Sequence, residues 1–413
     1  MIGSLFAGVS GLNANATAMS VIGDNIANVN TTAFKSNRAS FANILSQSLE
    51  GSTGNNIGRG VEFWGTSPVW SQGSLETTNN PTDLAINGRG FFIVKHPETG
   101  KVYYTRAGEF RFDKVGNLAN ADGLVVQGWN LVEGQSAPGP TENINIPGGS
   151  TSSPKATETL TADINLDAGA STGSEDDPSY STSLTVYDSL GNDIVLQINF
   201  WKKSEGTWGW VAKVPETVGS VKEGTGSGEL KFSEDGTLED GTDPEIEIEL
   251  TNGAKTPQTI TWDLYDDDTG KTNGDVTQYS SPCTTTFQTQ DGRSAGTLQS
   301  ISVDEEGVIT GVYSNGETKP LYQIALVDFQ SYWGLARTGK NLYSESLASG
   351  QPVKGTAGSG SLGTISANSL EMSNVDLASE FVKMITTQRA FQANSRVITT
   401  SDEILADLIS IKR

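Results

Sequence analysis

The chain has 413 residues, 18% of them charged and 8% aromatic, with a formal net charge of −22. This length exceeds the usual size of a single hydrophobic core, so we expect two or three globular units. The acidic balance argues against nucleic acid or an anionic membrane surface as a partner. The single cysteine, Cys283, excludes an intrachain disulfide. Because no uninterrupted apolar run of about 18 residues occurs, no membrane insertion is predicted.

The first predicted element is a helix over residues 4–29. Its apolar side chains recur at steps of three, four and seven residues, a spacing suited to helix-on-helix packing; they are Leu5, Val9, Leu12, Ala16, Met19 and Ile26. Ser4 fits an N-cap. Gly8, Gly11 and Gly23 each cost a helix about 1 kcal/mol relative to alanine. We therefore expect this helix to be marginal alone and to fold when packed against partners.

Residues 31–70 are predicted to form an extended connector, since regular periodicity is weak and glycine and serine are frequent. Phe63, Trp64 and Trp70 would anchor it, although its glycines fit a disordered loop as well.

Two sets of predicted strands flank the centre of the chain. The first set contains residues 91–94, 102–104, 110–112 and 124–126, joined by turns at glycine. The second set contains residues 301–303, 308–309 and 321–327. Their common character predicts one inner β domain, over residues 71–145 and 298–364, which an insertion interrupts.

The insertion, residues 146–297, is predicted to be an outer antiparallel β domain with one wet face. Strands are expected at residues 184–187, 194–201, 208–214 and 245–250. Residues 151–300 hold 26 acidic and 9 basic side chains, so most of the negative charge lies here. Such a surface faces solvent and repels non-specific contact with other copies.

The last predicted element is a helix over residues 375–411, roughly 55 Å long at 1.5 Å per residue. Apolar residues fall every seven positions, at Leu377, Met384, Phe391, Ile398 and Leu405. Phe381 and Ile409 add to the adjacent position, and Ser373 with Asp376 resembles a capping box. Two interpretations of the terminal helices stay open. They form either a helical hairpin that closes one domain or the polymerisation element of a subunit that assembles through its ends.

No catalytic, cofactor or metal site is predicted. The segment 224–228 resembles a phosphate-binding loop, but neither a strand before it nor a helix after it supports that reading. The carboxylate-rich loops at residues 235–243 and around Asp266, Asp267 and Asp268 lack the ligand spacing of a calcium loop. The only histidine, His96, lies beside Pro97 in a predicted turn. We therefore predict a protein that is not an enzyme.

Both ends of the chain resemble the family of bacterial flagellar rod, hook and hook-associated proteins. At the N-terminal end the resemblance is carried by Asn25, Ile26, Ala27, Asn28, Phe34 and Lys35. At the C-terminal end it is carried by Ser373, Asn374, Val375, Asp376, Gln388, Arg389 and Ala390. Residues 84–92 and 339–343 of the inner domain are similar to the same family. Residues 186–192 resemble the outer domain of its hook-type members, which rod proteins lack.

The resemblance implies a mainly β fold whose terminal helices, residues 1–30 and 365–413, pair as a coiled coil and polymerise. It implies a structural subunit of the hook, self-assembling into a flexible curved tube that transmits torque from rod to filament. The implied partners are further copies, the rod, hook cap and hook–filament junction proteins, and the flagellar type III export apparatus. The implied location is extracellular, reached without a cleaved signal peptide. A distal rod or hook-associated protein is the alternative within the family. A secreted β-rich adhesin using Trp201, Trp208 and Trp210 is the alternative outside it.

Overall fold

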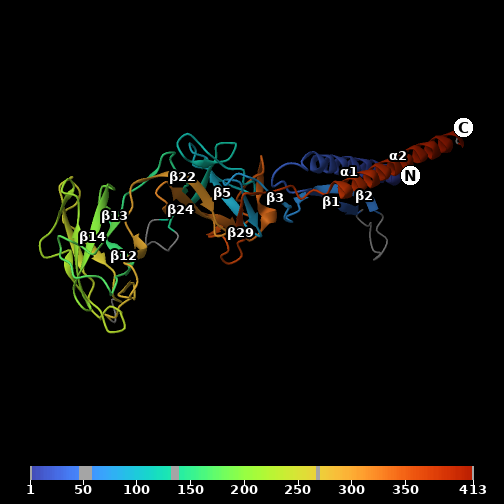
Figure 1. The fold of residues 1–413 in the computed structure, drawn as a ribbon. Coiled ribbons are helices and arrows are strands. Elements are labelled where there is room, and N and C mark those ends of the chain that lie inside the picture. The colour runs from blue at the N-terminus through green and yellow to red at the C-terminus, as the bar shows by residue number, and fades with distance from the viewer. Residues whose placement is uncertain (1, 46–57, 132–138, 267–269, 412–413) are drawn as a thin grey trace. The chain divides into compact units, whose positions relative to one another are not determined.

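The computed structural model describes residues 2–45, 58–131, 139–266 and 270–411 (Figure 1). Asp267 and Asp268 of the predicted carboxylate loop lie outside the described residues. The chain divides into two compact units. Unit 1 comprises Met1–Gly148, Ile301–Gly311 and Lys319–Arg413, and unit 2 comprises Gly149–Ser300 and Val312–Thr318. The predicted mainly β fold with N- and C-terminal helices in contact is confirmed.

Unit 1 contains both long helices and a series of short strands. The helices are α1 (Ile2–Ala27), α2 (Leu377–Ile411) and the short 3-10 helix η1 (Tyr332–Gly334). The strands are β1 (Asn37–Leu45), β2 (Gly58–Pro68), β3 (Leu75–Thr77), β4 (Leu84–Asn87), β5 (Phe91–Lys95), β6 (Val102–Thr105), β7 (Arg111–Phe112), β8 (Leu118–Ala119), β9 (Val125–Asn130), β10 (Glu142–Asn143), β25 (Leu326–Asp328), β26 (Ala336–Gly339), β27 (Leu342–Ser344), β28 (Val353–Gly355), β29 (Thr364–Ala367) and β30 (Ser369–Glu371). Three further strands hold residues of both units: β22 (Gly296–Val303), β23 (Val308–Tyr313) and β24 (Thr318–Ile324).

The main sheet of unit 1 is built around β5, which pairs with β6 on one side and β9 on the other. Both neighbours are antiparallel, and β27 and β26 extend the sheet beyond β6. The first four residues of β5, the apolar run 91–94, are all buried, because this strand is covered on both faces. Trp70, a predicted anchor, packs its ring against Phe91 at a centroid distance of 5.6 Å and against Tyr343 at 5.2 Å.

The predicted connector contains a two-stranded sheet in which β1 and β2 pair antiparallel (Figure 1). Phe41 lies opposite Phe63, with ring centroids 6.0 Å apart, while Trp64 is 79% exposed. The register shifts between Ser40 and Phe41. Such a bulge interrupts the period-two alternation of side chains, which explains why periodicity did not reveal these strands.

Unit 2 is a sandwich of two sheets. The strands of these two sheets are β12 (Thr159–Asn165), β13 (Tyr180–Tyr187), β14 (Asp193–Ser204), β15 (Thr207–Lys213), β16 (Gly219–Val221), β17 (Ser227–Lys231), β18 (Glu245–Leu250), β19 (Gln258–Trp262), β20 (Val276–Thr277) and β21 (Thr284–Gln290). The unit also contains β11 (Thr151–Ser152), which pairs with β22 outside the sandwich. One sheet has the order β13-β14-β15-β17, and the other has the order β16-β18-β19-β12-β20 with β21 beside β12. The pairing is antiparallel except where β12 runs parallel to β19 and β20, so the prediction of a purely antiparallel module is wrong there. Long connections separate β12 from these partners and permit the parallel pairing.

A single core fills the space between the two sheets of unit 2. Trp262 of β19 packs edge-on against Trp210 and Phe200 of the facing sheet, with centroids 5.3 and 6.0 Å apart. Trp208 is fully buried, and Trp201 is also buried. The tryptophans that an adhesin would expose are therefore core residues.

The turn between β13 and β14 is held by a buried carboxylate. Asp188 Oδ1 accepts the backbone N–H groups of Leu190 and Asn192 at 2.8 and 2.9 Å. Its Oδ2 accepts the side-chain N–H groups of Asn192 at 2.8 Å and Asn252 at 2.6 Å. Burial by itself would raise the pKa of Asp188, but these hydrogen bonds more than offset it, and the pKa lies below its ordinary value. Gly191 supplies the positive φ, +85°, that closes the turn.

Asp113 and Asn117 form the same hydrogen bonds in unit 1. Asp113 Oδ1 accepts the N–H groups of Val115 and Asn117, and Oδ2 accepts the Asn117 side chain. Aspartate followed three residues later by glycine and then asparagine thus defines a hairpin turn that the chain uses in both units.

We expect Asp188→Asn to destabilise unit 2 by about 1–3 kcal/mol, because an amide would place its own N–H groups against those of Asn192 and Asn252. The pKa of Asp188 is lower in the folded chain than in the unfolded chain. The stabilisation is therefore complete above the unfolded pKa, near 3.8, and is lost as pH falls through the folded value. Calorimetry of the full chain at several pH values measures both effects. Asp193→Asn, an exposed neighbour, is the control, and equal unfolding temperatures for the two variants would contradict the role of Asp188.

Candidate assembly surface at the terminal helices

The helices α1 and α2 lie side by side and antiparallel (Figure 1). Near the start of α1, Ser4 Oγ lies 3.3 Å from Ser401 Oγ, and near its end Asn25 Nδ2 donates to Glu380 Oε2 at 3.2 Å. The prediction of Ser4 as an N-cap is wrong, because α1 begins at Ile2 and Ser4 lies in its first turn. The cap of α2 is Asp376 alone, which accepts the N–H of Ala378 at 3.0 Å.

The two helices approach each other through small residues. Gly8 and Gly11 are buried in the contact. A Cβ atom on Gly8 would lie 2.9 Å from Ile398 Cγ1, and one on Gly11 would lie 2.7 Å from Asn394 Nδ2. These distances are shorter than carbon and nitrogen atoms tolerate without displacement. The glycines that weaken α1 as an isolated helix are therefore what lets α2 pack against it.

The predicted packing residues of α1 lie to one side of this contact. Leu5, Leu12, Met19 and Ile26 are half-buried, while Val9 is 47% exposed, and Ala16 is exposed. Successive residues of a helix are rotated by about 100°, so the apolar side chains follow a stripe next to the glycine stripe. By length and composition alone, α1 is apolar enough to cross a membrane over Gly3–Ala27.

The predicted packing residues of α2 divide between two faces. Met384, Ile398 and Leu405 are half-buried on the side that faces α1, whereas Leu377, Phe381 and Phe391 are exposed. Other large apolar side chains of α2 are exposed as well, namely Val382, Ile385, Val397, Ile404 and Ile409. Both helices thus carry apolar surface that the described residues of the chain leave uncovered.

A buried ion network joins the helix ends to the β domain of unit 1. Glu371, fully buried at the end of β30, accepts from Lys35 Nζ at 2.6 Å and lies 3.4 Å from Arg106 Nη1. Gly73 N–H also donates to it, at 3.0 Å. Burial lowers the pKa of Lys35, while the Glu371 carboxylate opposes that shift. Periodicity did not single out Glu371 or Arg106; the one available signal was a lone glutamate in an otherwise uncharged segment, residues 364–375.

The N-terminal residues 25–35 and the C-terminal residues 373–390 that carry the family resemblance are called the two signatures here. Three asparagines of these signatures form hydrogen bonds that hold neighbouring segments together. Asn25 is buried, donates to Asn37 O at 2.8 Å and accepts from Asn37 N–H at 2.7 Å. Asn374 accepts from Ser36 N–H at 2.7 Å and donates to Val69 O at 2.8 Å. Asn28 donates to Asp24 O at 2.9 Å and holds the turn that follows α1.

The remaining signature residues differ in exposure. Lys35 and Ser373 are buried, Ile26, Phe34, Val375 and Ala390 are half-buried, and Ala27, Asp376, Gln388 and Arg389 are exposed. The structure thus brings the N-terminal signature and residues 373–376 together, whereas residues 388–390 lie farther along α2.

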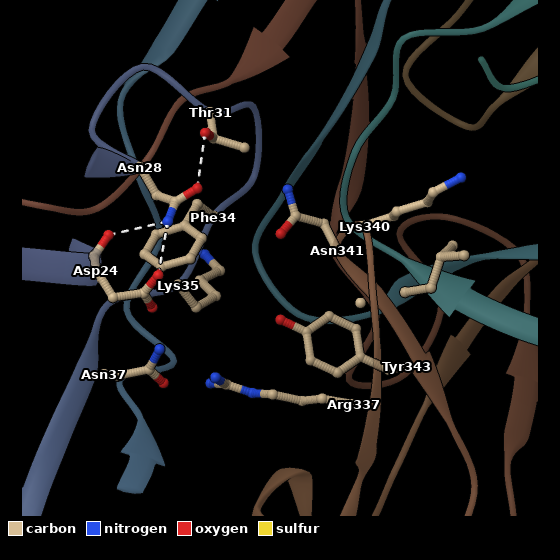
Figure 2. A pocket seen from close by; sticks show the side chains of 12 residues that line it. Asp24, Asn28, Thr31, Phe34, Lys35, Asn37, Arg337, Lys340, Asn341 and Tyr343 are labelled. Carbon is tan, nitrogen blue, oxygen red and sulfur yellow. Dashed lines mark hydrogen bonds between the residues drawn. The ribbon is translucent and has the colours of Figure 1, made fainter. Parts of the chain in front are cut away.

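A pocket of about 270 Å³ opens between the signature turn and the β26–β27 hairpin (Figure 2). Asp24, Asn28 and Asn37 line one wall, and Asn341, Tyr343 and Arg337 line the other. The hairpin turns at Lys340 and Asn341, both with positive φ, and Asn341 Nδ2 donates to Thr32 O at 2.8 Å across the pocket rim. The pocket marks the base of the helix pair and contains no arrangement of catalytic groups.

We expect Glu371→Gln to cost about 3–5 kcal/mol of folding free energy, because Lys35 and Arg106 would remain buried without a carboxylate. Urea unfolding of the full chain measures this. Glu76→Gln is the matched control, since Glu76 is exposed on β3, the strand that pairs with β30. A Glu371→Gln chain as stable as the control would show that the network does not hold these segments together.

We expect Gly8→Leu to separate α1 from α2, because the new side chain would occupy the space of Ile398. Gly23→Leu is the matched control on the same helix, since a Cβ atom there meets nothing within 4 Å. Limited proteolysis of the two terminal segments measures the difference. Equal protection of both variants would contradict the close contact.

Four protein-family models match this chain. They are described as flagella basal body rod protein (residues 5–35), flagellar hook protein FlgE/F/G D1 domain (85–165), flagellar basal body protein FlaE D2 domain (159–293) and flagellar basal body rod FlgEFG protein C-terminal (366–411). Among solved structures, the Helicobacter pylori flagellar hook protein FlgE2 has a similar fold, with a TM-score of 0.52 and 14% identity. The match covers 72% of this chain and 100% of that one.

Three curated proteins that are similar to this chain over their whole length are each described as flagellar hook protein FlgE. The Treponema pallidum and Borreliella burgdorferi proteins are each 35% identical, with 100% of both chains covered. The Escherichia coli protein is 34% identical, with 98% of each chain covered. Because identity above 30% extends over the full length of these proteins, the chain belongs to the flagellar hook protein FlgE family.

Proposed function

We propose that the chain is the structural subunit of a flagellar hook, and that its terminal helices polymerise it into a flexible curved tube. One observation supports polymerisation through the terminal helices. The helices α1 and α2 pair through small residues and leave apolar side chains exposed along both helices. Covering such side chains is favourable, by roughly 1.5–3 kcal/mol for each one fully buried. Further copies of the same helix pair supply that cover.

A protein partner fits the exposed helices better than a lipid bilayer does. Although α1 is apolar enough to span a membrane, its buried face is occupied by α2. Seven charged residues lie along α2, namely Glu380, Lys383, Arg389, Arg396, Asp402, Glu403 and Asp407. Carrying them into hydrocarbon would be costly. The surface of another helix pair accommodates both the apolar and the charged side chains.

We propose a separate role for each segment of the chain. Residues 1–30 and 365–413 form the polymerisation domain, and residues 31–70 connect it to the inner β domain, residues 71–145 and 298–364. Residues 146–297 form the acidic outer domain, which makes weak, adjustable contacts because screened surface charges hold no fixed register. Strong apolar contacts near the axis and weak polar ones outside allow a tube to bend while it transmits torque from rod to filament.

The proposed partners are the rod, hook cap and hook–filament junction proteins, together with the flagellar type III export apparatus. Export by that route requires a chain that travels unfolded to the cell exterior. The single cysteine is compatible with this route, since no intrachain disulfide has to form. A helix interrupted by Gly8, Gly11 and Gly23 is also easily kept unfolded until it meets its partners.

A distal rod or hook-associated protein is the alternative within the family. The D2 domain match over residues 159–293 and the full-length similarity to hook proteins favour the hook. Immunolabelling of isolated basal bodies distinguishes the two locations: antibody against the outer domain should decorate the curved segment, and labelling of the rod alone would reject the hook assignment.

We expect Val9→Asp and Phe391→Asp each to prevent polymerisation, because both side chains are exposed in one copy and would be buried between copies. Electron microscopy of the purified full chain shows whether tubes form. Asn13→Asp, an exposed position on α1, is the control and should still give tubes. Normal tubes from the Val9 and Phe391 variants would reject the terminal helices as the polymerisation element.

A further inference from the structure

The two terminal helices differ in length, and α2 extends beyond α1. Gly8 faces Ile398, and Ser4 faces Ser401, so Ile2, the first residue of α1, comes opposite the region near residue 403. The backbone of α2 therefore continues past the first residue of α1 over residues 404–411 (Figure 1). This end of α2 is about 12 Å long.

One stripe of exposed side chains runs along α2 on the side away from α1. Its members are spaced by four, four, three, four, seven and four residues, which keeps them on one face of a helix; they are Phe381, Ile385, Arg389, Gln392, Arg396, Glu403 and Asp407. The character of the stripe changes along its length. It is apolar at the start, cationic at Arg389 and Arg396, and anionic at Glu403 and Asp407.

The charges of this stripe are not neutralised within one copy. Side chains of a helix meet at spacings of three or four residues, whereas Arg396 and Glu403 are seven residues apart, or about 10 Å along the axis. Among the described residues of α2, only Lys383 and Glu380 form an ion pair. Arg389 and Arg396 have no acidic partner in the part of the chain that the structure describes.

We propose that the anionic end of α2 in one copy, Glu403 and Asp407, packs beside Arg389 and Arg396 of α2 in a neighbouring copy. This inference rests on the proposed function, since it specifies how copies meet in the polymer. Two parallel α2 helices shifted by 7 to 14 residues, roughly 10–21 Å, place opposite charges side by side. Without a shift, arginine would face arginine and carboxylate would face carboxylate.

The occupant of this surface is a second copy because the two halves of the stripe complement each other and no other charge pattern is required. With the two α2 helices parallel and shifted along their axes, the contact is heterologous, and it repeats from copy to copy into a filament rather than closing into a dimer. An anionic membrane would attract the arginines but would be repelled by Glu403 and Asp407. Ile404 and Ile409 are also exposed at this end of α2, but on other faces of the helix than the stripe.

The experiment compares three charge variants of the full chain in a polymerisation assay. The first is Arg389→Glu with Arg396→Glu, the second is Glu403→Arg with Asp407→Arg, and the third combines all four changes. We expect each double variant to reduce polymer mass by about tenfold, because attraction becomes repulsion, and the combined variant to restore it. Asp402→Arg is the matched control, since Asp402 is exposed but is rotated by about 100° from Glu403, and it should assemble as the unchanged chain does.

Three outcomes separate this proposal from the function on which it rests. Double variants that assemble normally would overturn it, as would double variants that fail without rescue by the combined variant. If the unchanged chain forms no tubes under the same conditions, the proposed polymer itself is wrong. Circular dichroism at each step checks that the helices are retained.

Disulfide formation provides an independent measurement in a Cys283→Ser background. Arg396→Cys together with Asp407→Cys should give a ladder of cross-linked copies from assembled chains on oxidation. Arg396→Cys with Asp402→Cys should give at least several-fold less. Equal ladders from both pairs would overturn the proposed contact.

Discussion

The close approach of α1 and α2 at Gly8 and Gly11 determines what the ends of the chain expose. Helix axes come this near only where no Cβ atom intervenes, and both glycines would collide with α2 if they carried one. Because small residues of α1 take the intrachain contact, Val9 of α1 stays exposed, as do several large apolar residues of α2 such as Phe381 and Ile385. The apolar surface that the helix pair exposes follows from this one constraint.

A second constraint fixes where the helix pair joins the rest of unit 1. Glu371 forms ion pairs with two residues from segments far apart in sequence, Lys35 after α1 and Arg106 in the β domain. A buried carboxylate without them would be costly, so the three segments come together or none of them is stable there. The network therefore links the base of the helix pair to the β domain of unit 1, while Asn25 and Asn374 hydrogen-bond to the adjoining backbone.

Much of the local structure was predictable from sequence, because it depends on neighbouring residues. The apolar run 91–94 forms a buried strand, and the strands expected in the outer module are present. The long C-terminal helix begins within two residues of its predicted start. These features follow from side-chain periodicity and turn residues, which a single sequence displays directly.

What could not be predicted depends on partners distant in sequence. Heptad spacing identified apolar stripes on α1 and α2, but it did not tell which stripe faces the other helix, and the glycine stripe takes that place. The bulge at Ser40 interrupts the alternation that would have predicted the β1–β2 pair. The residues around Glu371 in the sequence do not indicate that Lys35 and Arg106 are its partners. Contacts between residues far apart in sequence depend on the whole fold, whereas the patterns in a single sequence report only on neighbouring residues.

The pairing of α1 with α2 also links the first residues of the chain to the last. Asn25 and Glu380 are 355 positions apart, and Lys35 and Glu371 are 336 apart. Contacts of this range form only after the intervening chain is present, and closing so long a loop is slow. The helix α1 therefore stays unpaired until α2 is present. A prematurely ended chain would lack α2 and could not build the helix pair, so the pair forms only in a chain that extends through α2.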